Sequence, residues 1–286
     1  MYKGMLDILV IGHSTHDVIV REDRTFSRLG GPPPYISRLL ESLNRAVGAK
    51  AKENFPELDY AIVSKVGPDF RYFTQLCQEP LVATKPTTCF VHHYQSSERV
   101  MEVENICEAI FPEDIKSESR IGLIAGVIGE VLPGTLERIS SVCKITFCDV
   151  QGLIRKVDHQ KRVYHVDLAN TEFCDVLPKI DFLRLNRLEA QFVKVKEISR
   201  KVIVLLTKGK DGCSLMEKGK EFEIPTRPVP EKDPTGAGDF FLGGFAYGIL
   251  RGYSLERCAQ IANYCGGLVV GTVGIPTEVR IKESFL

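Results

Sequence analysis

The chain has 286 residues, of which 44% are hydrophobic and 26% are charged, which suits one sizeable globular domain spanning 1–286. Lys plus Arg and Asp plus Glu both number 37, so no basic surplus favours nucleic acid or an anionic membrane as a partner. The first residues lack the layout of a signal peptide and the apolar runs are far shorter than the ~20 residues that span a bilayer, so we expect a cytoplasmic protein.

The chain contains nine cysteines and six histidines, and neither set has the spacing of a metal site. No Cys-x-x-Cys occurs, and the pairs His13/His16 and His92/His93 have no matching ligands. We therefore expect free thiols that pack in the core of a protein in a reducing compartment, and no structural zinc.

Short and almost continuously apolar runs recur along the chain and predict strands that are covered on both faces. Segments with helical spacing lie between several of them, such as 35–47 and 134–142. This alternation predicts an α/β fold with a doubly wound, mostly parallel sheet. The predicted strands are 6–12, 60–63, 121–124, 145–148, 182–185 and 202–206.

Each of these strands stops at polar or glycine residues. Ligands in open α/β sheets bind beyond the carboxyl ends of the strands, so we expect the strand ends to converge on one cleft. Any one of them also fits an ordinary turn. The strand ends are 13–17, 64–69, Gly126, Asp149, Asn186 and 207–209.

Two segments, at about 18–29 and 88–103, break the alternation and predict hairpins. Four short strands that leave the main sheet would form a small β lid over the cleft. Such a lid excludes water from a reacting group. An ordinary surface hairpin explains each pattern equally well.

Gly30 and Gly31 follow the first hairpin and precede three prolines. Paired glycines let a backbone approach a ligand closely, and the prolines favour a helix that begins at Tyr35. The prolines are equally typical of a stiffened loop.

Asn186 and Glu189 are three residues apart and would share one face of a helix. A carboxylate beside an amide suits hydrated magnesium, which prefers oxygen ligands and keeps its waters. A capping pair is the commoner explanation of this spacing. Farther along the chain, 207–212 predicts a tight turn, 214–217 and 220–224 predict a hairpin, and 255–266 and the last residues predict helices.

The stretch Asp233-Pro234-Thr235-Gly236-Ala237-Gly238-Asp239 is the strongest functional signal, and the apolar run 240–250 after it is compatible with a buried helix. A glycine-rich turn that opens a helix points backbone amides outward at the positive end of the helix dipole, where phosphate binds. Asp239 would repel an anion there, unless it is a base that takes a proton from a hydroxyl attacking phosphorus. A helix cap without chemistry is the alternative.

This heptapeptide resembles the second signature of the ribokinase-like (pfkB) family of small-molecule kinases, and the similarity runs from Leu6 to about Thr277. The resemblance implies a ribokinase-like fold, ATP as donor and Mg²⁺ as cofactor, and it leaves open whether a monovalent cation activates the enzyme. It also implies that Asp239 is the catalytic base and that the amides of Gly236, Ala237 and Gly238 form the anion hole. Matching positions assign Asn186, Thr207, Gly209, Gly212, Thr235, Asn263 and Gly271 to ATP, Asn186 and Glu189 to magnesium, and Asp17, Gly30, Gly31, Tyr35, Asp149 and Arg155 to the substrate.

The substrate side departs from the sugar kinases of the family, which usually carry asparagine shortly after the diglycine. Tyr35 stands there instead, which argues against an ordinary ribose or fructose site. The neighbourhoods 16–18, 65–72 and 149–155 are similar to the plant-type myo-inositol kinases of the family, although Gln151 replaces an asparagine of the family pattern. The resemblance therefore favours ATP-dependent phosphorylation of a hydroxyl of a cyclic polyol, above all myo-inositol.

Two alternatives stay open. Another kinase of the family, acting on ribose, fructose or a nucleoside, would carry the same catalytic motif. A non-catalytic relative that serves as an interaction module is disfavoured, because a scaffold needs no base beside an anion hole. The expected partners are a small polyol and ATP rather than nucleic acid or a membrane, and the chain is either a monomer or a homodimer joined through lid edges.

Overall fold

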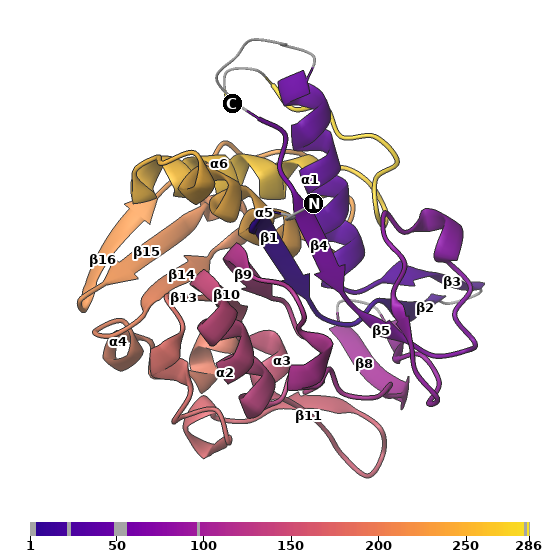
Figure 1. Ribbon diagram of the computed structural model, residues 1–286. Coiled ribbons are helices and arrows are strands. Elements are labelled where there is room, and N and C mark those ends of the chain that lie inside the picture. The colour runs from indigo at the N-terminus through magenta and orange to yellow at the C-terminus, as the bar shows by residue number, and fades with distance from the viewer. Residues whose placement is uncertain (1–3, 22–23, 49–55, 96–97, 283–284, 286) are drawn as a thin grey trace.

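The computed structural model describes residues 4–21, 24–48, 56–95, 98–282 and 285 (Figure 1). These residues form a central eight-stranded sheet with the order β16-β15-β14-β13-β10-β9-β1-β4. Neighbouring strands from β14 to β4 are parallel, and β15 and β16 add an antiparallel hairpin at one edge. The strands are β1 (Leu6–Ile11), β4 (Tyr60–Val63), β9 (Ser119–Ile124), β10 (Cys143–Asp149), β13 (Phe182–Asn186), β14 (Ile203–Thr207), β15 (Cys213–Glu217) and β16 (Lys220–Ile224).

Helices cover both faces of this sheet, as Figure 1 shows. Along β1, Ile8 and Val10 pack on one face, and Leu9 and Ile11 pack on the other. Both alternate sets are apolar because neither face of the strand meets water. The first face is covered by α1 (Pro32–Gly48), α5 (Ala237–Leu250) and α6 (Leu255–Val269), and the second by α2 (Pro133–Val142), α3 (Gln151–Ile154) and α4 (Val195–Ile198).

The two predicted hairpins pair into a separate four-stranded sheet, here called the lid sheet, with the order β3-β2-β7-β8. Its strands are β2 (Thr15–Arg21), β3 (Arg24–Gly30), β7 (Cys89–Gln95) and β8 (Glu98–Asn105), and the intervening residues 22–23 and 96–97 lie outside the described residues. Only 12–14 separate β1 from β2, so the carboxyl edge of the central sheet continues directly into the lid sheet.

Short elements complete the chain. Strands β5 (Lys65–Val66) and β6 (Leu81–Val82) form one small pair, and β11 (Arg155–Val157) and β12 (Val163–His165) form another. Single 3₁₀ turns occur at η1 (Phe73–Gln75), η2 (Pro112–Asp114), η3 (Leu168–Asn170), η4 (Leu177–Lys179), η5 (Glu189–Phe192) and η6 (Gly209–Asp211). All nine cysteines are free thiols and most are buried, as expected. Within the described part of the chain no helix is long and apolar enough to cross a membrane.

The α/β class, the six predicted strands and the β15–β16 hairpin are confirmed. Helix α1 begins at Pro32, earlier than predicted, because the first turn of a helix tolerates residues without an amide hydrogen. The helix predicted for the last residues is wrong for 271–282, which contain none, and 283, 284 and 286 lie outside the described residues. Gly274, with φ of +75°, and Pro276 interrupt helical geometry there, and the segment packs Ile275 against the core.

Candidate active site

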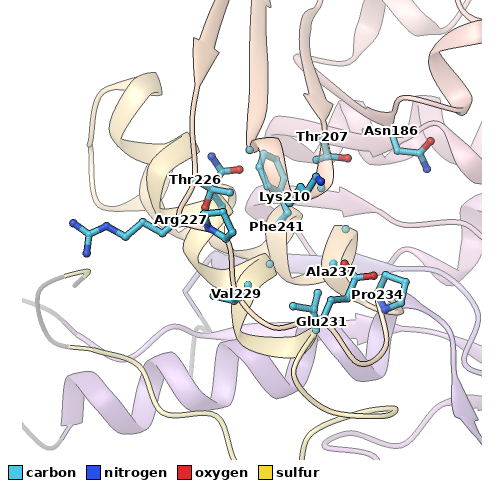
Figure 2. A pocket seen from close by; sticks show the side chains of 18 of the residues that line it. Asn186, Thr207, Lys210, Thr226, Arg227, Val229, Glu231, Pro234, Ala237 and Phe241 are labelled. Carbon is cyan, nitrogen blue, oxygen red and sulfur yellow. The ribbon is translucent and has the colours of Figure 1, made fainter.

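Two cavities meet at the loop that leads into α5. Cavity I, of about 290 Å³, lies between α5, α6 and the segment 226–231 (Figure 2). Cavity II, of about 270 Å³, lies between the same loop, the start of α1 and the lid sheet. Their junction is lined from both sides by Arg184, Asn186, Pro234 and Gly238.

The loop owes its shape to Gly236, whose φ of +84° lies in the left-handed region. A Cβ at this position would lie 2.2 Å from Cδ1 of Tyr35, so no side chain fits between the loop and α1. Helix α5 then begins at Ala237, so its first amides have no acceptor within the helix, and Ala237 and Gly238 line cavity I. The amide of Ala237 donates to the carbonyl of Pro234 at 3.2 Å, so in this arrangement it closes the turn.

Asp239 lies in the first turn of α5 and lines cavity II. The N-cap of α5 is Gly236, and Asp239 is the third helical residue after it. Removal from bulk water raises the pKa of Asp239 to about 7, and the nearby Asp149 acts in the same direction, while Arg184 and Arg155 lower it. A carboxylate with a pKa near neutrality is suited to act as a general base.

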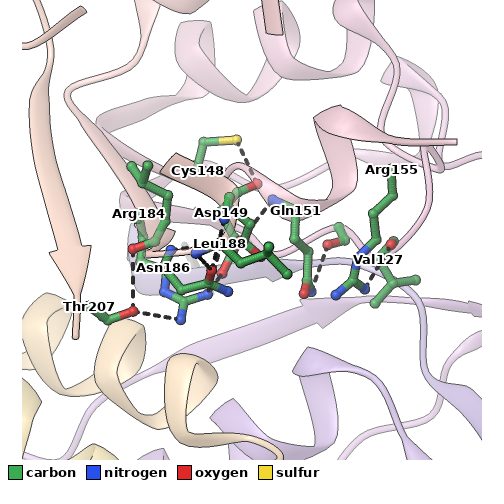
Figure 3. A network of polar contacts seen from close by, with 12 residues as sticks. Val127, Cys148, Asp149, Gln151, Arg155, Arg184, Asn186, Leu188 and Thr207 are labelled. Carbon is green, nitrogen blue, oxygen red and sulfur yellow. Dashed lines mark hydrogen bonds and ion pairs between the residues drawn. The ribbon is translucent and has the colours of Figure 1, made fainter. Parts of the chain in front are cut away.

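Arg184 lies beside the loop, and the sequence interpretation missed it. Its Nη1 donates to Oδ2 of Asp149 at 2.8 Å, and its Nη2 donates to Oγ1 of Thr207 at 3.0 Å (Figure 3). A Cβ added to Gly238 would lie 2.4 Å from Nη2, so the guanidinium packs directly on the loop backbone. The available signal was a single charged residue inside an apolar strand, because a buried arginine must be paired.

Asp17 presents a buried carboxylate to cavity II from strand β2. Oγ1 of Thr15 donates to its Oδ1 at 2.8 Å, and Nε2 of His92 lies 3.7 Å from its Oδ2. Burial alone would raise the pKa of Asp17, but the nearby His92 and the hydrogen bond from Thr15 outweigh it and hold the pKa below the usual value. Gly30 lies opposite, where a Cβ would come within 2.3 Å of the carboxylate, so this glycine makes room for Asp17.

Tyr35, Gly31 and Arg155 also line cavity II. The Tyr35 hydroxyl is buried and has no hydrogen-bond partner among the described residues, and burial raises the pKa of this phenol. Nη1 of Arg155 donates to the carbonyl of Val127 at 3.3 Å, and Gln151, which replaces the asparagine of the family pattern, lines the same cavity.

Most residues assigned to ATP line cavity I. These are Asn186, Thr207, Gly209, Gly212 and Asn263, and the Asn263 side chain donates to the carbonyl of Ile224 at 3.0 Å. Thr235 lines cavity II instead, because its hydroxyl donates a hydrogen bond to Oδ1 of Asp233 at 2.6 Å. Gly271 lines neither cavity, although its neighbour Val270 lines cavity I.

Asn186 and Glu189 form a reciprocal pair at the end of β13. Oδ1 of Asn186 accepts from the amides of Leu188 and Glu189 at 2.8 and 3.0 Å, and Oε2 of Glu189 accepts from the amide of Asn186 at 2.8 Å. This is the capping arrangement that the sequence also allowed. Asn186 lines both cavities, whereas Glu189 is buried behind it and burial raises the pKa of its carboxyl group.

Some residues predicted at the site lie behind the walls of the two cavities. Asp149 and Glu189 support Arg184 and Asn186 but line neither cavity. Residues 64–69, expected at the same cleft, also line neither cavity, because β5 pairs with β6 and Nζ of Lys65 lies 2.6 Å from Oδ2 of Asp114.

Comparison with known proteins identifies the relatives of this chain. Residues 139–279 match the family described as pfkB family carbohydrate kinase. The chain is 37% identical to "Inositol 3-kinase" of Zea mays, over 95% of this chain and 74% of that protein. It is 33% identical to the Arabidopsis thaliana protein of the same name, over 94% of this chain and 75% of that protein.

Solved structures show the same ribokinase-like fold. A pyrophosphate-dependent kinase of the ribokinase family, complexed with a pyrophosphate analog and myo-inositol, superposes with a TM-score of 0.73 at 18% identity, covering 93% of this chain and 96% of that one. Adenosine kinase from Sinorhizobium meliloti gives 0.71 at 17% identity, covering 99% and 98%. With these relatives over nearly its whole length, the chain belongs to the pfkB family of carbohydrate kinases.

Proposed function

We propose that this protein transfers the terminal phosphoryl group of ATP to a hydroxyl of myo-inositol, at the 3-position for which its plant relatives are named. One observation carries the proposal: two cavities of similar volume meet at a helix N-terminus, beside a carboxylate whose pKa is raised to about 7. Cavity I would hold the donor and cavity II the acceptor, so the transferred group would pass the amide end of α5.

Asp239 would act as the base. As the acceptor oxygen bonds to phosphorus, the bond from phosphorus to the bridging oxygen of the donor breaks, and the hydroxyl proton passes to Asp239. The amides of Gly236 and Gly238 would face the developing negative charge, and the Ala237 amide would complete the anion hole once it leaves the Pro234 carbonyl. Asp17 would accept hydrogen bonds from two neighbouring hydroxyls of the polyol, because an ionised carboxylate only accepts.

Asn186 and Glu189 would hold magnesium, which would supply positive charge to neutralise the phosphates of the donor. Their oxygens suit this ion. Both lone pairs of the Asn186 amide oxygen are already used by backbone donors, so the residues fit a hydrated ion held through its waters better than a directly coordinated one.

ATP would fill cavity I better than pyrophosphate would. Asn263 also lines the cavity. The cavity extends between apolar side chains such as Val229 and Phe241 (Figure 2), a space that would suit a purine and that pyrophosphate would leave empty. Apolar side chains with a few polar groups among them are typical of sites for a flat heterocycle.

A radiolabel transfer assay tests the proposal with myo-inositol, ribose, fructose and adenosine as acceptors and with ATP or pyrophosphate as donor. We expect myo-inositol with ATP to give the highest kcat/KM and the product to carry phosphate on the 3-hydroxyl. Preference for ribose, fructose or adenosine would overturn the substrate, and preference for pyrophosphate would overturn the donor. Replacing potassium by tetramethylammonium in the same assay determines whether a monovalent cation takes part.

A further inference from the structure

We propose that Arg184 is a catalytic group that binds the phosphoryl oxygens during transfer between the two cavities. The proposal rests on the function proposed above and adds to it a residue outside the motifs described above. Arg184 lines both cavities, which places its guanidinium at the only junction that a group moving from one described cavity to the other would pass.

The guanidinium is held rigidly in this position. Asp149 accepts from Nη1 at 2.8 Å, Thr207 accepts from Nη2 at 3.0 Å, and the side chain is only 10% exposed. Its Nε has no hydrogen-bond partner among the described residues. A planar cation with a fixed orientation is preorganised for tetrahedral or trigonal phosphoryl oxygens.

The loop backbone is built around this side chain. Gly238 is the position at which a Cβ would meet Nη2 at 2.4 Å and Nη1 at 2.7 Å, so only glycine lets the guanidinium lie against the first turn of α5. The positive end of the helix dipole and the arginine charge therefore point at the same place. Donors that are already oriented toward developing charge lower the barrier without reorganising during the reaction.

A purely structural role would be to neutralise Asp149. The position of Arg184 favours more than that, because its side chain lines both cavities and its guanidinium lies against the Gly238 backbone, where a phosphoryl group would bring negative charge. During transfer Arg184 stays protonated, since the hydroxyl proton goes to Asp239.

The test compares Arg184→Gln and Arg184→Lys with the parent and with Arg120→Gln. Arg120 pairs with Asp7 at 3.1 Å on a different part of the central sheet and lines neither cavity, so its variant controls for loss of a paired arginine. We expect Arg184→Gln to lower kcat by about 10²-fold with the KM values for myo-inositol and ATP changed less than threefold. Arg184→Lys keeps the charge but not the planar fork, and we expect about a 10-fold loss.

The pH profile gives a second measurement that a structural role would not change. Two carboxylates near Asp239, those of Asp149 and Asp17, raise its pKa. The guanidinium groups of Arg184 and Arg155 lower it, and the Tyr35 phenol that also faces Asp239 is neutral. Removing the Arg184 charge should therefore move the acid limb of the pH–rate profile to higher pH in Arg184→Gln, while Arg184→Lys keeps the parent midpoint.

The outcomes separate two failures. If the parent transfers no phosphate to myo-inositol, the proposed function fails. If the parent is active and Arg184→Gln keeps kcat within twofold, or loses activity only through a raised KM with an unmoved acid limb, the assignment of Arg184 fails alone. Should Arg184→Gln not fold, Arg184→Lys decides: a kcat equal to that of the parent would overturn the proposal.

Discussion

Arg28 donates from Nη1 to Oδ2 of Asp233 at 2.7 Å and from Nη2 to Oγ1 of Thr235 at 3.3 Å, which ties lid strand β3 to the loop that leads into α5. Asp233 also accepts from the amide and the hydroxyl of Thr235, at 3.0 and 2.6 Å. The ion pair is mostly buried, with side chains 14% and 6% exposed. The lid sheet and the loop are thus held in one arrangement by a contact between residues far apart in the chain.

Arg28→Gln should destabilise the fold, because it leaves the Asp233 carboxylate buried without its cation. We expect the free energy of unfolding to fall by about 3 kcal/mol at pH 7. Urea unfolding measures the change. Arg45→Gln is the control, because Arg45 belongs to an exposed pair with Glu41 and its removal should change stability by less than about 0.5 kcal/mol.

The same variant should also be more sensitive to acid. Burial raises the pKa of Asp233, but hydrogen bonds from Thr235 and Arg28 outweigh it and lower the pKa to about 2. The stabilisation by this carboxylate is therefore complete above its ordinary pKa of 3.8 and is lost as pH falls toward 2. Without Arg28 the loss should begin at higher pH; equal acid midpoints for parent and variant would contradict the role of this pair.

The rate of transfer should depend on the ionisation of Asp239. Since its pKa is raised to about 7, the base is protonated in acid, and log kcat should rise with pH up to about 7 and then level off. Asp239→Asn should lower kcat by 10²-fold or more and remove this dependence. Steady-state kinetics from pH 5.5 to 9 measure both, and a variant as fast as the parent would rule out Asp239 as the base.

Asp239→Asn should at the same time stabilise the protein at neutral pH. The folded-state pKa of about 7 lies above the ordinary value of 3.8, so the folded state holds a proton that the unfolded state has released between these values. Parent stability from this group therefore falls as pH rises from about 4 to 7, by on the order of a few kcal/mol. The variant should be more stable than the parent above pH 7 and equal to it below pH 4 in thermal unfolding.

The ring and the hydroxyl of Tyr35 contribute separately to stability, and two variants distinguish these contributions. Tyr35→Phe removes only a buried hydroxyl that has no partner among the described residues, so the free protein should gain up to about 1 kcal/mol of stability. Tyr35→Asn, which introduces the side chain usual in sugar kinases, also removes the ring beneath Gly236 and should cost about 3 kcal/mol. Denaturant unfolding orders the three proteins, and a Phe variant less stable than the parent would show that the hydroxyl is paired.

The features that the sequence predicts well are those that depend on residues close together in the chain. The runs that form β1 and β13 are apolar because both faces are covered, and the loop before α5 needs its glycines within a few residues. The position of Thr235 could not be predicted, because its side chain follows Asp233 toward cavity II rather than toward the donor cavity. The partners of Arg28 and Arg184 lie far away in sequence, so only the folded topology shows what these charges do.

Gly238→Ala provides a sharp test of how closely the loop and Arg184 fit. Alanine favours a helix by about 1 kcal/mol over glycine, so propensity alone predicts a more stable protein. The new Cβ would lie 2.4 Å from Nη2 of Arg184, and the guanidinium must move to avoid it. We therefore expect a folded protein with kcat lowered by about 10²-fold.

The matched control is Gly134→Ala in helix α2, where the nearest atom to the added Cβ is 3.7 Å away, in Pro112. That variant should keep its activity and gain stability. In the double variant Gly238→Ala with Arg184→Gln the two losses should not add, because both act on the same guanidinium. Additive losses in kcat would mean that Gly238 acts through its amide alone and that displacement of Arg184 is not the cause.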